Sequence, residues 1–184
     1  MEETNDTTAR RTILGVALLS LLATFFGVSA ITGGTETIAS ALKADTADAE
    51  WVFKAYAITF AVLLLVGGKL GDLFGRRKAL LAGLAVLAAG SAAAGAVSDT
   101  GWLIALRVVQ GAGAALVLPA TLALILETFP RRQRTGAFGF WTAAVGVAFA
   151  GGIALSGLAI EELSWRWLFY GNAIVALVAG LFAL

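Results

Sequence analysis

Neither cysteine nor histidine occurs anywhere in the sequence. Without cysteine the chain has no disulfide, no thiolate nucleophile and no thiolate metal site. Without histidine it has no imidazole base, no serine–histidine–aspartate triad and no histidine-bound zinc or haem. We therefore expect the protein to use neither a metal nor a cofactor.

Charge and proline are also scarce, whereas apolar residues are abundant. Charged residues make up 14% of the 184 residues, and there are two prolines. Hydrophobic residues make up 59%, and the 22 glycines raise the apolar share to about seven tenths, against roughly 45–50% in soluble domains. A soluble domain of about 150 residues buries only about 70% of the surface that its unfolded chain exposes. The composition therefore predicts an integral membrane protein.

Six apolar runs are long enough to cross the roughly 30 Å core of a bilayer as helices. They are continuous and do not alternate with polar residues, which favours helices over the strands of a membrane barrel. A tail of residues 1–11 precedes the runs, which cover residues 12–33, 51–68, 79–97, 102–126, 137–160 and 167–184. The polar segment 35–50 fits either a short amphipathic helix or a loop. The predicted fold is an all-α bundle of six transmembrane helices.

Positive charge is shared unevenly between the two ends of these runs. Nine lysines and arginines fall in the tail and in the loops after the second and fourth runs, against three on the opposite side. Because positively charged loops tend to stay in the cytoplasm, both termini are predicted to be cytoplasmic. Tryptophans mark the outer ends of the runs, as expected for a membrane interface: Trp51, Trp102, Trp165 and Trp167. We expect a multi-pass protein of the plasma (inner) membrane.

The loop after the second run has the most specific pattern in the sequence, with Gly68, Asp72, Gly75, Arg76 and Arg77 in fixed order. Asp72 would stand near the C-terminal end of a helix, where the helix dipole disfavours an anion. It therefore needs a cation, and Arg76 follows four residues later. Gly75 permits a tight reversal of the chain. An ordinary positively charged loop would explain the charges but not this spacing.

This loop resembles the signature loop of the major facilitator superfamily, whose members are transporters and not enzymes. A second stretch, Arg107-x-x-Gln110-Gly111 in the fourth run, is similar to another motif of that family. The likeness covers residues 13–184 and is closest to the N-terminal half of the fourteen-helix drug/proton antiporters. It implies a six-helix half of the major facilitator fold.

The resemblance also implies a function and the residues that serve it. It implies efflux of small amphipathic or hydrophobic compounds, as in multidrug resistance, coupled to protons and performed by alternating access. The five loop residues named above would form a conformational gate. Four glycines would allow helices to pack closely: Gly111, Gly113, Gly151 and Gly152. The expected partners are the lipid bilayer, a small-molecule substrate and the proton, with no nucleic acid.

Two charged residues of the fourth run need an explanation. Arg107 lies about six residues inside the run, where a charge costs about 2.5–3.5 kcal/mol on insertion scales. It can extend to the outer interface, or it can line a central cavity together with Gln110. The resemblance implies that Arg107 and Gln110 couple proton movement to substrate movement. Glu127 ends the run beside an arginine-rich loop, as an ion-pair partner or as part of a gate.

The sequence departs from the antiporter pattern at three places. Gly27 stands where antiporters usually carry an acid in helix one. Val147 and Ala148 replace the Gly-Pro pair of helix five, which predicts a straighter helix. Leu73 replaces a residue that is often basic. These departures concern proton coupling and leave membership of the superfamily unaffected.

The length corresponds to one six-helix half of such a transporter, and three interpretations follow. The chain is a fragment of a longer transporter, or a natural half that pairs with a second six-helix half, for example as a homodimer. Alternatively it does not transport and acts as a membrane binding or regulatory protein. Because the two halves of this fold are related by an axis along the membrane normal, a parallel homodimer could imitate the whole transporter.

Overall fold

The computed structural model describes the backbone of residues 2–184 and the side chains of residues 10–29, 31, 32 and 34–184. Over residues 2–184 the chain forms six α-helices. They are α1 (Glu2–Leu42), α2 (Thr46–Phe74), α3 (Arg76–Ala96), α4 (Thr100–Thr128), α5 (Arg131–Glu162) and α6 (Arg166–Ala183). Each contains a stretch that is long and apolar enough to cross a membrane. The predicted all-α bundle of six membrane helices is confirmed.

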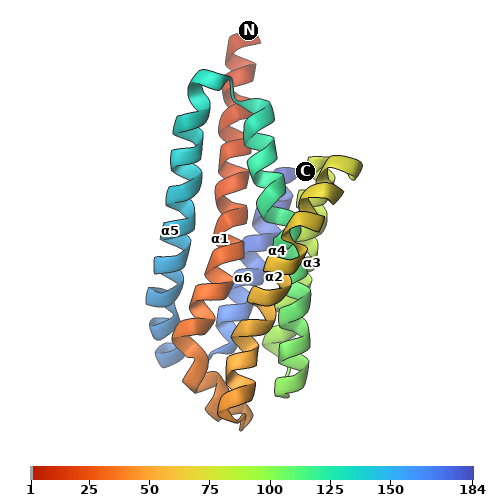
Figure 1. Cartoon of the computed structure of the whole chain (residues 1–184). Helices are drawn as coiled ribbons and strands as arrows, with labels where there is room; N and C mark the ends of the chain where they lie inside the picture. Colours follow the sequence, from red (N-terminus) through yellow and green to blue (C-terminus); the bar gives the residue numbers. More distant parts are fainter. Residues whose placement is uncertain (1) are drawn as a thin grey trace.

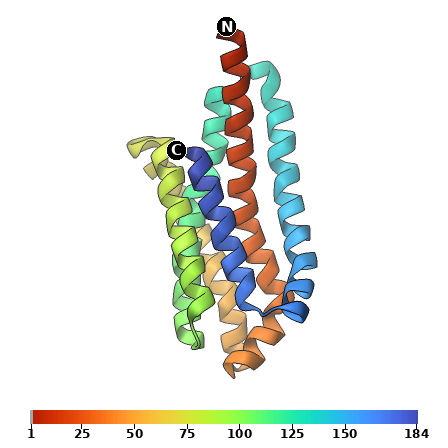
Figure 2. The ribbon, with the colours of Figure 1, turned by 180° about the vertical axis from the view of Figure 1, so that it is seen from behind.

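The helices run alternately in opposite directions (Figure 1). Both chain ends and the α2–α3 and α4–α5 turns lie at one end of the bundle, which we call the terminal end. The other three turns lie at the opposite, distal end, as the view from behind also shows (Figure 2). The two termini therefore share one side. That this side is cytoplasmic stays a prediction.

α1 occupies the centre of the bundle. It packs mainly against α5 and α6, while α2 packs along α4, and α3 lies against both α4 and α6. α5 is attached almost entirely through α1. The bundle therefore has a well-packed group of α1, α2, α3, α4 and α6, with α5 along one side.

The polar segment 35–50 forms neither a separate surface helix nor a long loop. α1 continues through it to Leu42, and α2 begins at Thr46. Lys43 adopts the left-handed conformation with φ of 52°, and the following backbone N–H bonds back into the last turn of α1, which is how many helices end. Asp45 then caps α2 by accepting from the backbone N–H of Asp48 at 2.8 Å. A three-residue hydrogen-bonded turn thus joins two long helices.

α2 and α3 meet at Gly75. Its φ of +99° is one that side-chain-bearing residues rarely adopt. The N–H of Gly75 bonds to the carbonyl of Gly71 at 3.0 Å, and Ala79 bonds back to the carbonyl of Gly75 at 3.0 Å. One residue thus ends one helix and begins the next, as the sequence suggested.

The close contact between α2 and α4 depends on glycine and proline. Pro119 lies inside α4 and has no N–H, so the carbonyl of Ala115 lacks its usual helical donor. Gly67 of α2 faces this carbonyl, and a Cβ at Gly67 would stand 2.1 Å from the oxygen. At the other end of the contact a Cβ on Gly111 would stand 2.6 Å from the carbonyl of Tyr56. The two backbones therefore touch where no side chain fits.

Candidate functional site

Arg107 lies about two turns into α4 from the distal end, and its side chain is only 1% exposed. Nε donates to the carbonyl of Val52 at 3.0 Å, and Nη1 donates to Oε1 of Gln110 at 2.6 Å. The guanidinium carbon stands 4.3 Å from the ring centroid of Tyr56. These contacts hold the charge in the interior, so Arg107 does not extend to the outer interface.

A chain of hydrogen bonds continues from Gln110 across two more helices. Nε2 of Gln110 donates to Oγ of Ser91 on α3 at 3.1 Å. Nδ2 of Asn172 on α6 donates to the same oxygen at 3.0 Å. We call Arg107, Gln110, Ser91 and Asn172 the buried polar chain. All four side chains are enclosed by this chain's own helices, so the expectation that Arg107 and Gln110 line an open cavity does not hold for the half-bundle.

The positive charge of Arg107 has no carboxylate partner within the described part of the chain. Its contacts are a carbonyl, a neutral amide and an aromatic ring, and its Nη2 makes no hydrogen bond to the described residues. Oδ1 of Asn172 is unpaired in the same way. A buried donor without an acceptor is costly. The site therefore retains one guanidinium nitrogen without an acceptor, on a full positive charge inside the bundle.

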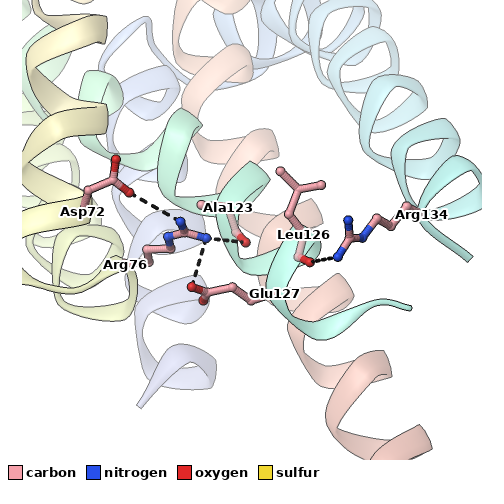
Figure 3. A network of polar contacts seen from close by, with 6 residues as sticks. All are labelled: Asp72, Arg76, Ala123, Leu126, Glu127 and Arg134. Atoms are coloured by element: carbon pink, nitrogen blue, oxygen red, sulfur yellow. Dashed lines mark hydrogen bonds and ion pairs between the residues drawn. The ribbon is translucent and has the colours of Figure 1, made fainter. Parts of the chain in front are cut away.

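Two of the five residues predicted for the gate, Asp72 and Arg76, form an ionic cluster with Glu127 at the terminal end (Figure 3). Nη2 of Arg76 lies 3.4 Å from Oδ1 of Asp72, and Nη1 lies 2.9 Å from Oε1 of Glu127. The same Nη1 donates to the carbonyl of Ala123 at 3.2 Å. The compensation of Asp72 by Arg76 is therefore present, and Glu127 is an ion-pair partner of the same arginine. The cluster joins the α2–α3 turn to the last turn of α4.

A second arginine holds the same end of α4. Nε of Arg134 donates to the carbonyl of Phe129 at 3.0 Å. Its Nη2 donates to the carbonyl of Leu126 at 2.6 Å, as Figure 3 shows. Arg77, also predicted for the gate, instead donates through Nε to the carbonyl of Ala183 on α6 at 2.7 Å. Gly68 lies one turn before Asp72 and packs near Pro119.

A cavity of about 810 Å³ opens beside this cluster. Asp72, Arg76 and Glu127 line it together with Arg77 and Lys78, and apolar side chains complete its wall. Three of the five charged residues are basic. Four of the five residues predicted for the gate, all but Gly68, therefore border an open, mixed-charge space at the terminal end. This space is well separated along α4 from the buried polar chain.

The four glycines predicted for helix packing behave differently. Gly111 meets α2, and a Cβ on Gly113 would stand 2.8 Å from the carbonyl of Gly83 on α3. Gly152 is buried on α5. No described atom lies within 4 Å of where a Cβ of Gly151 would stand. Of these four glycines, the two of α4 therefore lie directly against the backbones of neighbouring helices, while Gly151 faces open space.

The sequence did not reveal that Ser91 and Asn172 belong to the buried polar chain. Ser91 lies in a run of alanines and glycines and is too small to stand out. Asn172 offered a signal, because it is an amide inside the sixth apolar run, and buried amides need partners. Its contact with Ser91 joins residues 81 positions apart, which no local pattern reveals.

The sequence profile of the Major Facilitator Superfamily matches residues 17–184. The tetracenomycin C resistance and export protein of Streptomyces glaucescens is 35% identical over 171 residues, covering 91% of this chain and 31% of that protein. The puromycin resistance protein pur8 of Streptomyces alboniger is 43% identical over 131 residues, covering 71% of this chain and 26% of that protein. The chain thus spans less than a third of the length of these two relatives.

Solved transporters share the fold. The proton:xylose symporter XylE bound to 6-bromo-6-deoxy-D-glucose superposes with a TM-score of 0.80 at 16% identity, over 97% of this chain and 45% of that one. A partially occluded, inward-open XylE from E. coli gives 0.77 at 18% identity, over 95% and 49%. At these identities the likeness concerns the arrangement of the six helices.

Proposed function

The chain belongs to the major facilitator superfamily of membrane transporters, and from this premise we propose that it forms the N-terminal six-helix half of a multidrug-type exporter. Its substrates would be small amphipathic or hydrophobic compounds, moved by alternating access and coupled to protons. Relatives named for tetracenomycin C export and puromycin resistance support this substrate class.

The observation that carries the proposal is the buried, acid-free environment of Arg107. A fixed positive charge in an apolar interior favours the deprotonated form of any acid that comes near it and disfavours the approach of a second cation. The charge therefore acts both on a proton held by a nearby acid and on a substrate that approaches. Through it, the binding of the proton can depend on the binding of substrate. Gln110 belongs to the same unit because it supplies the acceptor for Nη1.

A second six-helix half would complete the transporter. α2 and α5 are the least buried of the six spans, and each presents large apolar side chains at its surface, including Val62, Leu65, Phe140, Val147 and Leu158. Faces of this kind are covered either by lipid or by another helix bundle. We propose that these two helices face the second half, supplied by the same polypeptide or by a second copy.

The ionic cluster at the terminal end would act as a gate. Arg76 joins the α2–α3 turn to α4 through Asp72 and Glu127. These pairs are largely exposed, so each contributes only about 0–1 kcal/mol. Weak links of this size can break and re-form as the bundle rocks during each transport cycle, which suits a gate better than a permanent brace.

Vesicles containing the whole transporter test the proposal. Puromycin or tetracenomycin C is added, and the pH of the lumen is followed with a trapped dye. We expect substrate-dependent proton movement that falls at least about tenfold in Arg107→Ala and stays unchanged in Arg132→Ala, because Arg132 is exposed and makes no described contact. If correctly folded protein gives no pH change with puromycin or with tetracenomycin C at any protein-to-lipid ratio, the result would support the non-transporting alternative instead.

A further inference from the structure

We propose that three residues from three other helices position the guanidinium of Arg107 through the side chain of Gln110. They are Ser91 of α3, Asn172 of α6 and Gly27 of α1. None of them needs to touch a substrate. The inference rests on the proposed coupling role of Arg107, and it adds that the helices around α4 set the geometry of that residue.

Ser91 determines which way the amide of Gln110 faces. Arg107 is only a donor, so it requires the oxygen of Gln110 and not the NH₂ group. The NH₂ group needs an acceptor on the opposite side, and the hydroxyl of Ser91 supplies it at 3.1 Å. Without that hydroxyl, only the bond from Arg107 itself favours this orientation of the amide, and the NH₂ group is left without an acceptor. A flipped amide would point donors at a donor.

Asn172 in turn fixes the position of Ser91. Its Nδ2 donates to the same hydroxyl oxygen at 3.0 Å, and both side chains are almost fully buried. Ser91 thus accepts two amide donors from two different helices. Removing the hydroxyl would leave two buried N–H groups unpaired, and hydrogen bonds linked in series in a low-dielectric interior reinforce one another.

Gly27 makes room for the amide of Asn172. A Cβ at position 27 would stand 2.7 Å from Nδ2 and 3.1 Å from Cγ of Asn172. A methyl group there would push the amide away from Ser91. By contrast, Gly15 on the same helix has no described atom within 4 Å of the corresponding point. The missing side chain of Gly27 is therefore part of the arrangement that holds Arg107.

The buried polar chain holds one part of the Arg107 guanidinium and leaves another part without a partner. Val52 and Gln110 occupy Nε and Nη1, and Nη2 has no described partner. A guanidinium anchored on two sides presents its third nitrogen in one direction. The positioning residues thus decide where the unused donor points.

The test compares substitutions at the positioning residues with matched substitutions elsewhere, in the whole transporter. Ser91→Ala is matched by Ser20→Ala, because Ser20 is equally buried but bonds only to its own helix at the carbonyl of Val16. Gly27→Ala is matched by Gly15→Ala. Thermal unfolding in detergent shows that each variant is folded, and Gly27→Ala keeps the test available if Ser91→Ala does not fold.

Two readouts follow. In puromycin transport, we expect kcat to fall about tenfold in Ser91→Ala and Gly27→Ala, with KM changing less than about twofold, because these residues do not contact substrate. Ser91→Thr keeps the hydroxyl and should restore most of the rate. In protein labelled with ¹⁵N-arginine, the Nε signal of Arg107, assigned by its loss in Arg107→Ala, should shift in both variants but not in the two controls.

The outcomes separate the two proposals. If the Arg107 signal and kcat respond to Ser91→Ala and Gly27→Ala no more than to the matched controls, the positioning inference is overturned, whatever Arg107 does. If Arg107→Ala transports normally, the proposed coupling role fails, while the shift of the Arg107 signal still reports whether the geometry depends on Ser91.

Discussion

At the scale of single residues, the charge of Arg107 is buried among neutral groups. A buried charge that loses one partner is destabilised by several kcal/mol, because the remaining groups cannot replace the lost solvation. Here the compensation comes from the Val52 carbonyl, the Gln110 amide and the Tyr56 ring. Arginine suits this role better than lysine, because its planar fork reaches separate acceptors while its face stacks on an aromatic ring.

Lys43 gives a prediction at the same scale. It is the one non-glycine residue with positive φ in the described part of the chain, and a Cβ is unfavourable in that conformation. Lys43→Gly should therefore raise the free energy of unfolding by about 0.5–1 kcal/mol. Chemical unfolding in detergent micelles measures it. In Ser40→Gly, one turn earlier in the regular helix, the same assay should show a loss of about 0.5 kcal/mol. A loss at both positions would contradict the argument.

At the scale of helices, arginines from neighbouring elements hold the C-terminal ends. None of the six described helices has a basic residue in its own last turn, yet the last carbonyls of a helix need donors. Arg166 reaches the end of α3, Arg134 the end of α4 and Arg77 the end of α6. The positive charge of each arginine also interacts favourably with the dipole of the helix whose C-terminal end it contacts. The same three arginines therefore pair the last carbonyls of α3, α4 and α6 and link these helices to their neighbours.

Arg166 provides the prediction for these links. Its Nη1 donates to the carbonyls of Gly95 and Val97 at 2.8 and 2.6 Å, and Nη2 donates to Ser98 at 3.3 Å. Arg166→Ala should lower the free energy of unfolding by about 1.5–3 kcal/mol. The loss is measured in the same detergent assay. Arg131→Ala, an exposed arginine that starts α5, is the control and should change stability by less than about 0.5 kcal/mol. Equal effects would refute a specific link.

The α2–α4 contact gives a second prediction for the helices. Gly67→Ala would place Cβ 2.1 Å from a backbone oxygen, and a backbone carbonyl cannot move aside as a side chain can. The two helices must separate, so we expect a loss of at least about 3 kcal/mol or no folded protein. Gly68→Ala is the neighbouring control, because its Cβ would stand 3.7 Å from Pro119. Comparable yields and melting temperatures for the two variants would show that the contact tolerates a side chain.

At the scale of the whole molecule, the paired termini and the charge distribution define an orientation that can be measured. The absence of cysteine from the sequence lets single cysteines be introduced without background labelling from this chain. Glu161→Cys marks the distal end and Gln133→Cys the terminal end, and both positions are exposed. We expect a membrane-impermeant maleimide to label Glu161→Cys on intact cells and Gln133→Cys only after permeabilisation. The reverse pattern would place the termini outside.

The fold was largely predictable from the sequence, because a spanning helix is specified by a continuous local run of apolar residues. The ion pair of Asp72 with Arg76 was also predictable, since the two lie only four residues apart in the sequence. The continuation of α1 to Leu42 was not, because its polar residues carry no apolar signal and the helix is supported there by neighbours. Asn172 was missed as a site residue because its partner Ser91 is distant in sequence.

The arginine links at the two ends of the bundle share one more property. Arg166 at the distal end and Arg134 and Arg77 at the terminal end all bond to backbone carbonyls. A guanidinium keeps its proton across the pH range of living cells, and a carbonyl has none to exchange. A membrane that stores energy as a proton gradient exposes the two faces of a protein to different acidity. Links of this kind therefore hold equally well on both faces of the membrane, and a difference in acidity between the two sides leaves them unchanged.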